Sequence, residues 1–130
     1  MEKKTLLSTL WVVLTVNFIF CDVFTLMHSE DLKKILTGVV DNIEISQEFL
    51  LFFAFMMEIP MLMILFSRLL KYKINKILNI ISALLLTVIQ VWSLTSGSFT
   101  LHYAFFSLVE ISICIFIFLI AVFWKPSHNT

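Results

Sequence analysis

The chain has 130 residues, of which 60% are hydrophobic and 15% aromatic, and its formal net charge is zero. Its mean hydropathy is +1.01. An ordinary globular domain is about 45–50% apolar, so a water-soluble fold of this length has no core large enough for these side chains. A neutral chain with few cations also gives no reason to expect nucleic-acid binding.

Four apolar segments are long enough to cross a membrane, since crossing as a helix takes about 20 mostly apolar residues. They span approximately residues 5–27, 47–69, 74–95 and 100–124. The charged start Glu2-Lys3-Lys4 resembles a secretory signal, but no small-x-small cleavage site follows, so we expect an uncleaved first helix. The sequence therefore predicts one domain, 1–130, that is all-α: an integral membrane four-helix bundle.

The Lys and Arg residues are distributed unevenly between the two sides of this topology. Two lie in the first loop, Lys33 and Lys34, and seven lie at the termini or in the second loop: Lys3, Lys4, Arg68, Lys71, Lys73, Lys76 and Lys125. The side richer in Lys and Arg is normally cytoplasmic. Both termini are therefore expected in the cytoplasm, and the first loop outside the cell membrane.

The first loop is the longest and contains helix signals of its own. Ser29 is placed to cap a short helix with Glu30 and Asp31 in its first turn, and Gly38 is placed to end it. We expect this helix to lie at the outer membrane surface. Ser46 is expected to cap the second span.

Three carboxylates fall inside the predicted spans: Asp22, Glu58 and Glu110. A carboxylate at the centre of a membrane helix costs about 2.5–3.5 kcal/mol on insertion scales, so it normally faces the bundle interior and often marks a functional site. The predicted hydrocarbon region contains no Lys or Arg to pair with them. The acids must then hold protons or bind a cationic guest. The alternative is that they only hydrogen-bond helices together, at about 0.6 kcal/mol each.

Other polar residues share helix faces with these acids at about 100° per residue, which predicts a polar interior that opens outward. The clearest face is on the third span, with Asn75, Asn79, Ser82, Gln90 and Ser93. Pro60 follows Glu58 by two residues and predicts a kink, which serves either a binding site or the helix shape alone.

Several residues are expected to have only packing or membrane roles. Cys21 and Cys114 are read as free, buried thiols. Aromatic residues near span ends are expected in interfacial belts: Trp11, Trp92, Trp124 and Tyr72. The Phe and Met residues of the second span are expected to face lipid or pack in the bundle: Phe49, Phe52, Phe53, Met56 and Met57.

The polar positions also carry a resemblance that covers nearly the whole chain. The motifs are Asn17, Cys21-Asp22-Val23-x-Thr25-Leu26-Met27, Leu36-Thr37-Gly38, Met57-Glu58-Ile59-Pro60, Ser67-Arg68-Leu69-Leu70, Gln90 and Phe106-x-x-x-Glu110. They resemble a bacterial family of small four-helix membrane proteins of unknown function, similar to the DoxX group in size and topology. The resemblance implies a bacterial inner-membrane protein and transfers no chemistry.

The candidate ligand- or proton-binding residues are Asp22, Glu58, Glu110, Gln90, Asn79 and Asn17. The sequence contains no specific catalytic, metal-ligand or nucleotide-binding motif, so no cofactor is expected and an enzyme is the less favoured class. We predict a protein that binds or carries a proton, cation or small ligand at a carboxylate cluster. The alternatives are an enzyme acting on a lipid-soluble substrate and an accessory subunit with a homo-oligomeric or protein partner.

Overall fold

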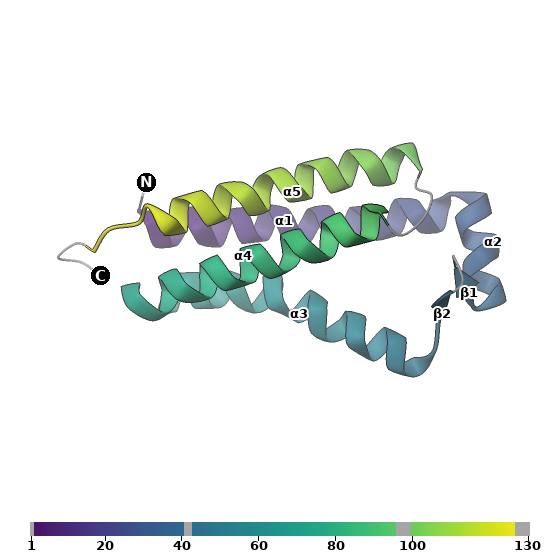
Figure 1. The fold of residues 1–130 in the computed structure, drawn as a ribbon, viewed down its shortest axis with the longest axis horizontal. Coiled ribbons are helices and arrows are strands. Elements are labelled where there is room, and N and C mark those ends of the chain that lie inside the picture. Colours follow the sequence, from purple (N-terminus) through teal and green to yellow (C-terminus); the bar gives the residue numbers. More distant parts are fainter. Residues whose placement is uncertain (1, 41–42, 96–99, 127–130) are drawn as a thin grey trace.

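The computed structural model describes residues 2–40, 43–95 and 100–126. Within them the chain forms five helices and two short strands (Figure 1). The elements are α1 Lys3–Met27, α2 Ser29–Thr37, β1 Val39–Val40, β2 Ile43–Glu44, α3 Gln47–Leu69, α4 Tyr72–Thr95 and α5 Leu101–Val122. Four of these helices are long and apolar enough to cross a membrane, which confirms the predicted number of spans.

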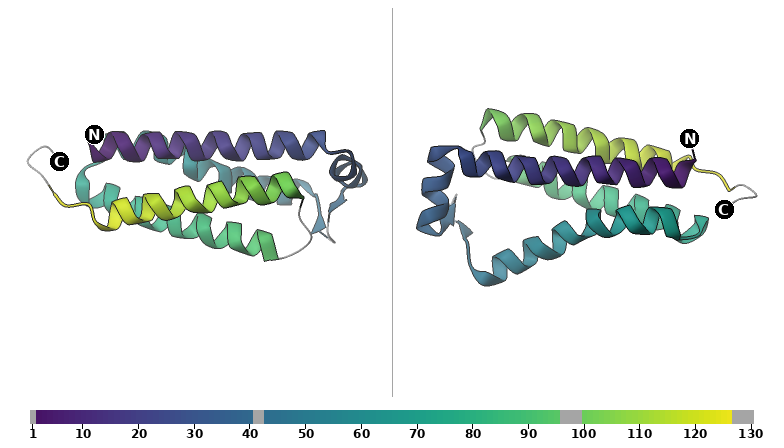
Figure 2. Two further views of the ribbon diagram at one scale, coloured as in Figure 1. Left: turned by 90° about the horizontal axis from the view of Figure 1, so that it is seen from above. Right: turned by 180° about the vertical axis from the view of Figure 1, so that it is seen from behind.

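The long helices run side by side in an elongated bundle (Figures 1 and 2). We call the end where α1 begins and α5 ends the terminal end, and the end with α2 the loop end. Helix α1 packs against α3 and α5, and α4 packs against α5, whereas α3 contacts α4 only sparsely. The bundle is therefore well packed along three seams and loosely packed along the seam between α3 and α4.

The segment between α1 and α3 begins with a helix that Ser29 does not cap. Only His28 separates α1 from α2, so Ser29 is already the first residue of α2 and no side chain caps this helix. Gly38 ends α2 as predicted, with φ 81°, a left-handed conformation that favours glycine. An antiparallel pair of two-residue strands follows, in which Val39 pairs with Glu44, and no sequence pattern predicts it.

Helix α3 begins with the predicted cap, since the Ser46 hydroxyl accepts a hydrogen bond from the Phe49 backbone N–H at 3.1 Å.

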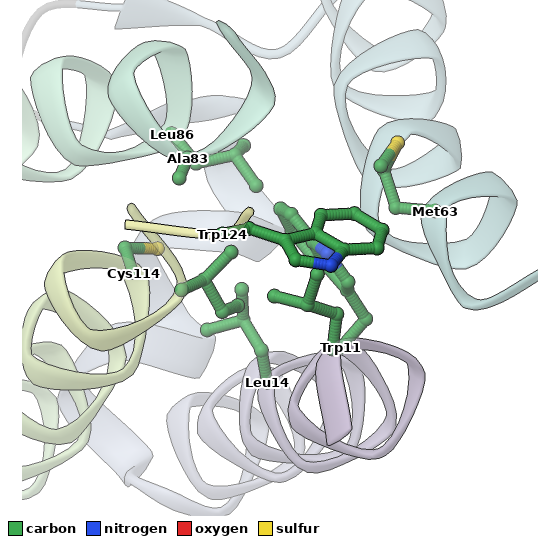
Figure 3. Close-up of a cluster of buried hydrophobic side chains, with 9 residues drawn as sticks. Trp11, Leu14, Met63, Ala83, Leu86, Cys114 and Trp124 are labelled. Atoms are coloured by element: carbon green, nitrogen blue, oxygen red, sulfur yellow. The ribbon is translucent and has the colours of Figure 1, made fainter. Parts of the chain in front are cut away.

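The apolar core lies in the terminal half of the bundle and in its middle. It joins side chains of all four long helices (Figure 3), namely Leu7, Trp11, Leu14, Met63, Ala83, Leu86, Cys114 and Ile117, with Trp124 just beyond α5. Trp11 is 0% and Trp124 3% exposed, so the prediction that they lie in aromatic belts was wrong. Trp92 keeps 60% of its side chain exposed. Burial of Trp11 is tolerated because its N–H has a partner within the bundle.

That partner belongs to a closed polar network that joins α1, α3 and α4. The Trp11 Nε1–H donates to Asn79 Oδ1 at 2.7 Å, and the Ser67 hydroxyl donates to the same oxygen at 3.4 Å. The Asn79 amide donates to Asn75 Oδ1 at 2.7 Å, and the Asn75 amide donates to the Ser67 carbonyl at 2.8 Å. All four side chains are 0% exposed. This network ties three helices together in the terminal half of the bundle and satisfies its buried polar side chains within the protein.

Candidate functional site

The loop half of the bundle contains a cavity of about 800 Å³, lined by residues from all four long helices and from the α2 segment. Helix α3 contributes only apolar side chains: Phe49, Leu50, Phe53, Ala54, Met56 and Met57. The bundle's polar lining comes from the other long helices and includes Cys21, Asp22, Gln90, Ser93, Tyr103 and Glu110. The cavity therefore has one apolar wall and an opposing wall that carries the acids.

The cavity exists because the loop half of α3 diverges from α4 (Figures 1 and 2). Pro60 lies inside α3 and is fully buried. A proline in a helix removes one backbone hydrogen bond and clashes with the preceding turn, so it bends the helix away from a straight path. From Pro60 to the terminal end, α3 returns to the core through Met63 and Ser67.

Glu110 is placed by a bond between α5 and α1. Its side chain is 1% exposed, and its Oε1 accepts a hydrogen bond from the Asn17 amide at 3.2 Å. The same Asn17 amide donates to the Phe106 carbonyl at 3.1 Å, which fixes its orientation. Asn17 therefore holds the Glu110 carboxyl group at the cavity wall.

Asp22 also lines the cavity. It lies on α1, closer to the loop end than Asn17, and it is exposed. Among the described residues, no hydrogen bond or ion pair joins Asp22 to another side chain. Asp22 is close enough to interact electrostatically with Glu110. Two carboxylates that face one cavity repel each other when both are ionised, so a proton or a bound cation stabilises the pair.

The cavity lining also includes one cationic side chain, from α2 at the loop end. Lys34 of α2 is the single Lys or Arg among the described lining residues, and it forms no ion pair with a described residue. At the same end His28 Nδ1 lies 3.1 Å from Asp31 Oδ2. The His28 and His102 ring centroids are 6.1 Å apart. Both histidines thus lie at the loop end, and His28 lines the cavity.

The neutral polar residues of α4 and α5 bond to each other across the helix seam. The Gln90 amide donates to the Ser107 hydroxyl at 2.6 Å, and the Ser93 and Tyr103 hydroxyls hydrogen-bond each other. These bonds fix α4 against α5 and hold Gln90 and Tyr103 at the cavity wall. Gln90 is 9% exposed, so most of its surface is already covered by the bundle.

The structure brings four of the six candidate residues together: Asp22, Gln90 and Glu110 line the cavity, and Asn17 holds Glu110. Asn79 belongs to the closed network of the terminal half. Glu58 is exposed on the surface of α3 and does not line the cavity.

The apolar wall of α3 was not recognised as part of a site. Sequence analysis assigns Phe49, Phe53, Met56 and Met57 to lipid contact or packing, whereas the structure places them on the cavity. Their spacing of i, i+4, i+7 and i+8 marks one helix face and was the available signal.

The remaining reactive groups add no metal centre. Cys21 and Cys114 are free and buried, as predicted. The part of the chain that the structure describes contains no group of three or more His, Cys, Asp or Glu residues that could hold a metal ion.

Comparison with known proteins gives one match. No curated protein and no solved structure is similar to the chain. A family described as a family of unknown function, DUF6326, matches residues 1–130, which confirms the prediction that the chain resembles a family without an assigned activity. With this match across its full length, the chain belongs to that family, DUF6326.

Proposed function

We propose that this protein binds small organic cations in its loop-half cavity, with Asp22 and Glu110 as the charged groups and Gln90 as a neutral one. The observation that carries the proposal is the pair of carboxylates on one cavity wall, of which Asp22 has no hydrogen bond or ion pair with a described residue. An ammonium group bound to the exposed Asp22 carboxylate, beside Glu110, offsets the mutual repulsion of the two acids and donates hydrogen bonds to Asp22.

The proposed orientation places the loop end outside the cell and the terminal end in the cytoplasm of a bacterium. It is supported by seven Lys and Arg residues at the terminal end, at the chain ends and where α3 and α4 meet, compared with two in α2. In this orientation the cation reaches the cavity from outside. We also propose that the protein is similar to the DoxX group in size and topology, which its small size and four long helices support.

The closed network of Trp11, Ser67, Asn75 and Asn79 supports binding from one side rather than a continuous path through the bundle. A carrier would have to break these bonds during each cycle. The proposal is therefore a binding function with an outward-facing site, and transport would require a second conformation.

The test uses the full chain in lipid nanodiscs and butylammonium as the probe, with binding measured by calorimetry. We expect Asp22→Asn to weaken butylammonium binding at least about tenfold. Two opposite charges about 4 Å apart attract by roughly 1 kcal/mol in water and roughly 4 kcal/mol near a protein surface, and tenfold corresponds to about 1.4 kcal/mol.

The matched control is Glu58→Gln, which removes a carboxylate from the same chain outside the cavity. It should leave butylammonium binding unchanged. Absence of butylammonium binding to the unmodified protein, or an equal loss in Asp22→Asn and Glu58→Gln, would reject the proposed function.

A further inference from the structure

The apolar wall of α3 lines a cavity that also contains two acids. A small hydrated cation makes no favourable contact with apolar side chains, so such a ligand does not account for this wall. Phe49, Phe53, Met56 and Met57 present one continuous face, and the Phe49 and Phe53 ring centroids are 4.7 Å apart. Phe53 is 42% exposed and lines the cavity, so part of its surface has no contact with other residues. Contact between this face and an apolar ligand group would remove apolar surface from water.

The composition of this wall also suits a ligand of variable shape. Methionine side chains are flexible and polarizable, and they adapt to irregular apolar groups. Aromatic rings attract an ammonium group through their faces. The cavity volume of about 800 Å³ lies within the roughly 300–1,000 Å³ of pockets that hold drug-sized molecules.

The cavity lies beside the most loosely packed seam of the bundle, between α3 and α4. Helices α3 and α4 contact each other only sparsely, and they diverge from their shared terminal end toward the loop end (Figure 1). Residues of both helices line the cavity, including Phe53 and Met57 on α3 and Ile89 on α4. In a membrane, this seam faces the acyl chains, while Asp22 lies near the loop end and hence near the head groups.

We propose that the cavity binds an amphiphilic amine, with its ammonium group on the exposed Asp22, beside the buried Glu110, and its hydrocarbon chain along the Phe49, Phe53, Met56 and Met57 face of α3. This inference rests on the proposed function and adds the class of ligand. A purely polar cation uses the acids alone, and a neutral lipid uses the apolar wall alone. The juxtaposition of both walls selects a molecule that carries both groups.

The test compares butylammonium, octylammonium and octanol on the full chain in lipid nanodiscs by calorimetry, with empty nanodiscs subtracted. Octylammonium should bind at least about tenfold more tightly than butylammonium, within a limit of about fourfold for each fully buried methylene. Phe53→Ala should reduce this chain-length gain at least about threefold. Met57→Ala is a second variant of the same wall, with the same expected direction.

The matched control is Phe55→Ala, which removes an identical ring from the same helix. Phe55 is 64% exposed and does not line the cavity, so its removal should not alter the chain-length gain. Equal affinities for butylammonium and octylammonium would overturn the inference and leave the proposed function standing. Octanol binding as tightly as octylammonium would overturn both, because the acids would then contribute nothing.

Discussion

In the terminal half of the bundle Trp11, Ser67 and Asn79 hydrogen-bond one another across three helices, whereas in the loop half Asp22 and Glu110 share the wall of a cavity. The difference follows from hydrogen-bonding capacity. Amide and hydroxyl groups both donate and accept hydrogen bonds, so a group of such side chains can supply all the partners that its members need. Ionised carboxylates only accept, so two that face each other need a proton or a cation from elsewhere.

The same contrast divides α3 at Pro60. On its terminal side, Met63 and Ser67 are buried against α1 and α4; on its loop side, Phe49 to Met57 border the cavity. One helix therefore stabilises the fold with one half and forms a binding wall with the other. A substitution in the terminal half should change stability, and a substitution in the loop half should change binding.

The largest expected effect is the loss of stability in Asn79→Leu. The substitution removes the partner of Trp11 Nε1, the Ser67 hydroxyl and Asn75 Oδ1. We expect a loss of about 3–5 kcal/mol, from about 0.6 kcal/mol for each of these hydrogen bonds in a membrane plus about 1–3 kcal/mol for an unsatisfied buried donor. Reversible unfolding in mixed detergent micelles measures this loss.

The control for Asn79→Leu is Thr9→Val, since the exposed Thr9 hydroxyl bonds only to the Thr5 carbonyl of its own helix. Butylammonium binding to Asn79→Leu should stay unchanged under conditions in which the protein is folded. Equal stability of the two variants would show that the terminal network is not what holds this half together.

A tenfold effect is expected in the labelling of the two cysteines. Cys21 lines the cavity beside Asp22, whereas Cys114 belongs to the apolar core. In Cys114→Ser, a positively charged methanethiosulfonate added outside the cell should label Cys21 at least about tenfold faster than a negatively charged one. The two acids attract the first reagent and repel the second by roughly 1 kcal/mol each at about 4 Å in water.

In Cys21→Ser, the remaining Cys114 should react slowly with both reagents. Similar rates at the two cysteines would contradict the division of the bundle into a loop half with a cavity and a closely packed terminal half. Labelling of Cys21 only from the cytoplasmic side would instead contradict the proposed orientation.

The smallest effect is expected at Gly38, between α2 and β1. Its φ of 81° costs an L-residue about 1–2 kcal/mol, and no atom lies within 4 Å of an added Cβ, so backbone strain alone acts in Gly38→Ala. Amide hydrogen exchange should accelerate in α2 about fivefold or more and stay unchanged in the terminal halves of α1 and α4. Gly38→Asn should show less acceleration, because asparagine tolerates this conformation better. Uniform acceleration throughout the chain would indicate that the two halves unfold together.

The sequence by itself determined the elements that depend on local composition. Apolar length set the four long helices, with the bounds of α3 found to the residue. Ser46 and Gly38 acted as local start and stop signals because each works through its own backbone neighbourhood. Three acids inside the spans indicated where a site should be sought, and two of them line the cavity.

On α4 the predicted polar face is the buried one, but on α1 and α3 only the tertiary structure decided which side faces the interior. In membrane helices nearly every face is apolar, so Trp11 could not be assigned to the core, nor Glu58 to the outside, from periodicity alone. The pairing of Val39 with Glu44 also depends on where α2 and α3 lie, because strands this short have no periodic signal. The cavity itself arises from the divergence of α3 from α4, and a separation between helices is encoded in no single segment of the chain.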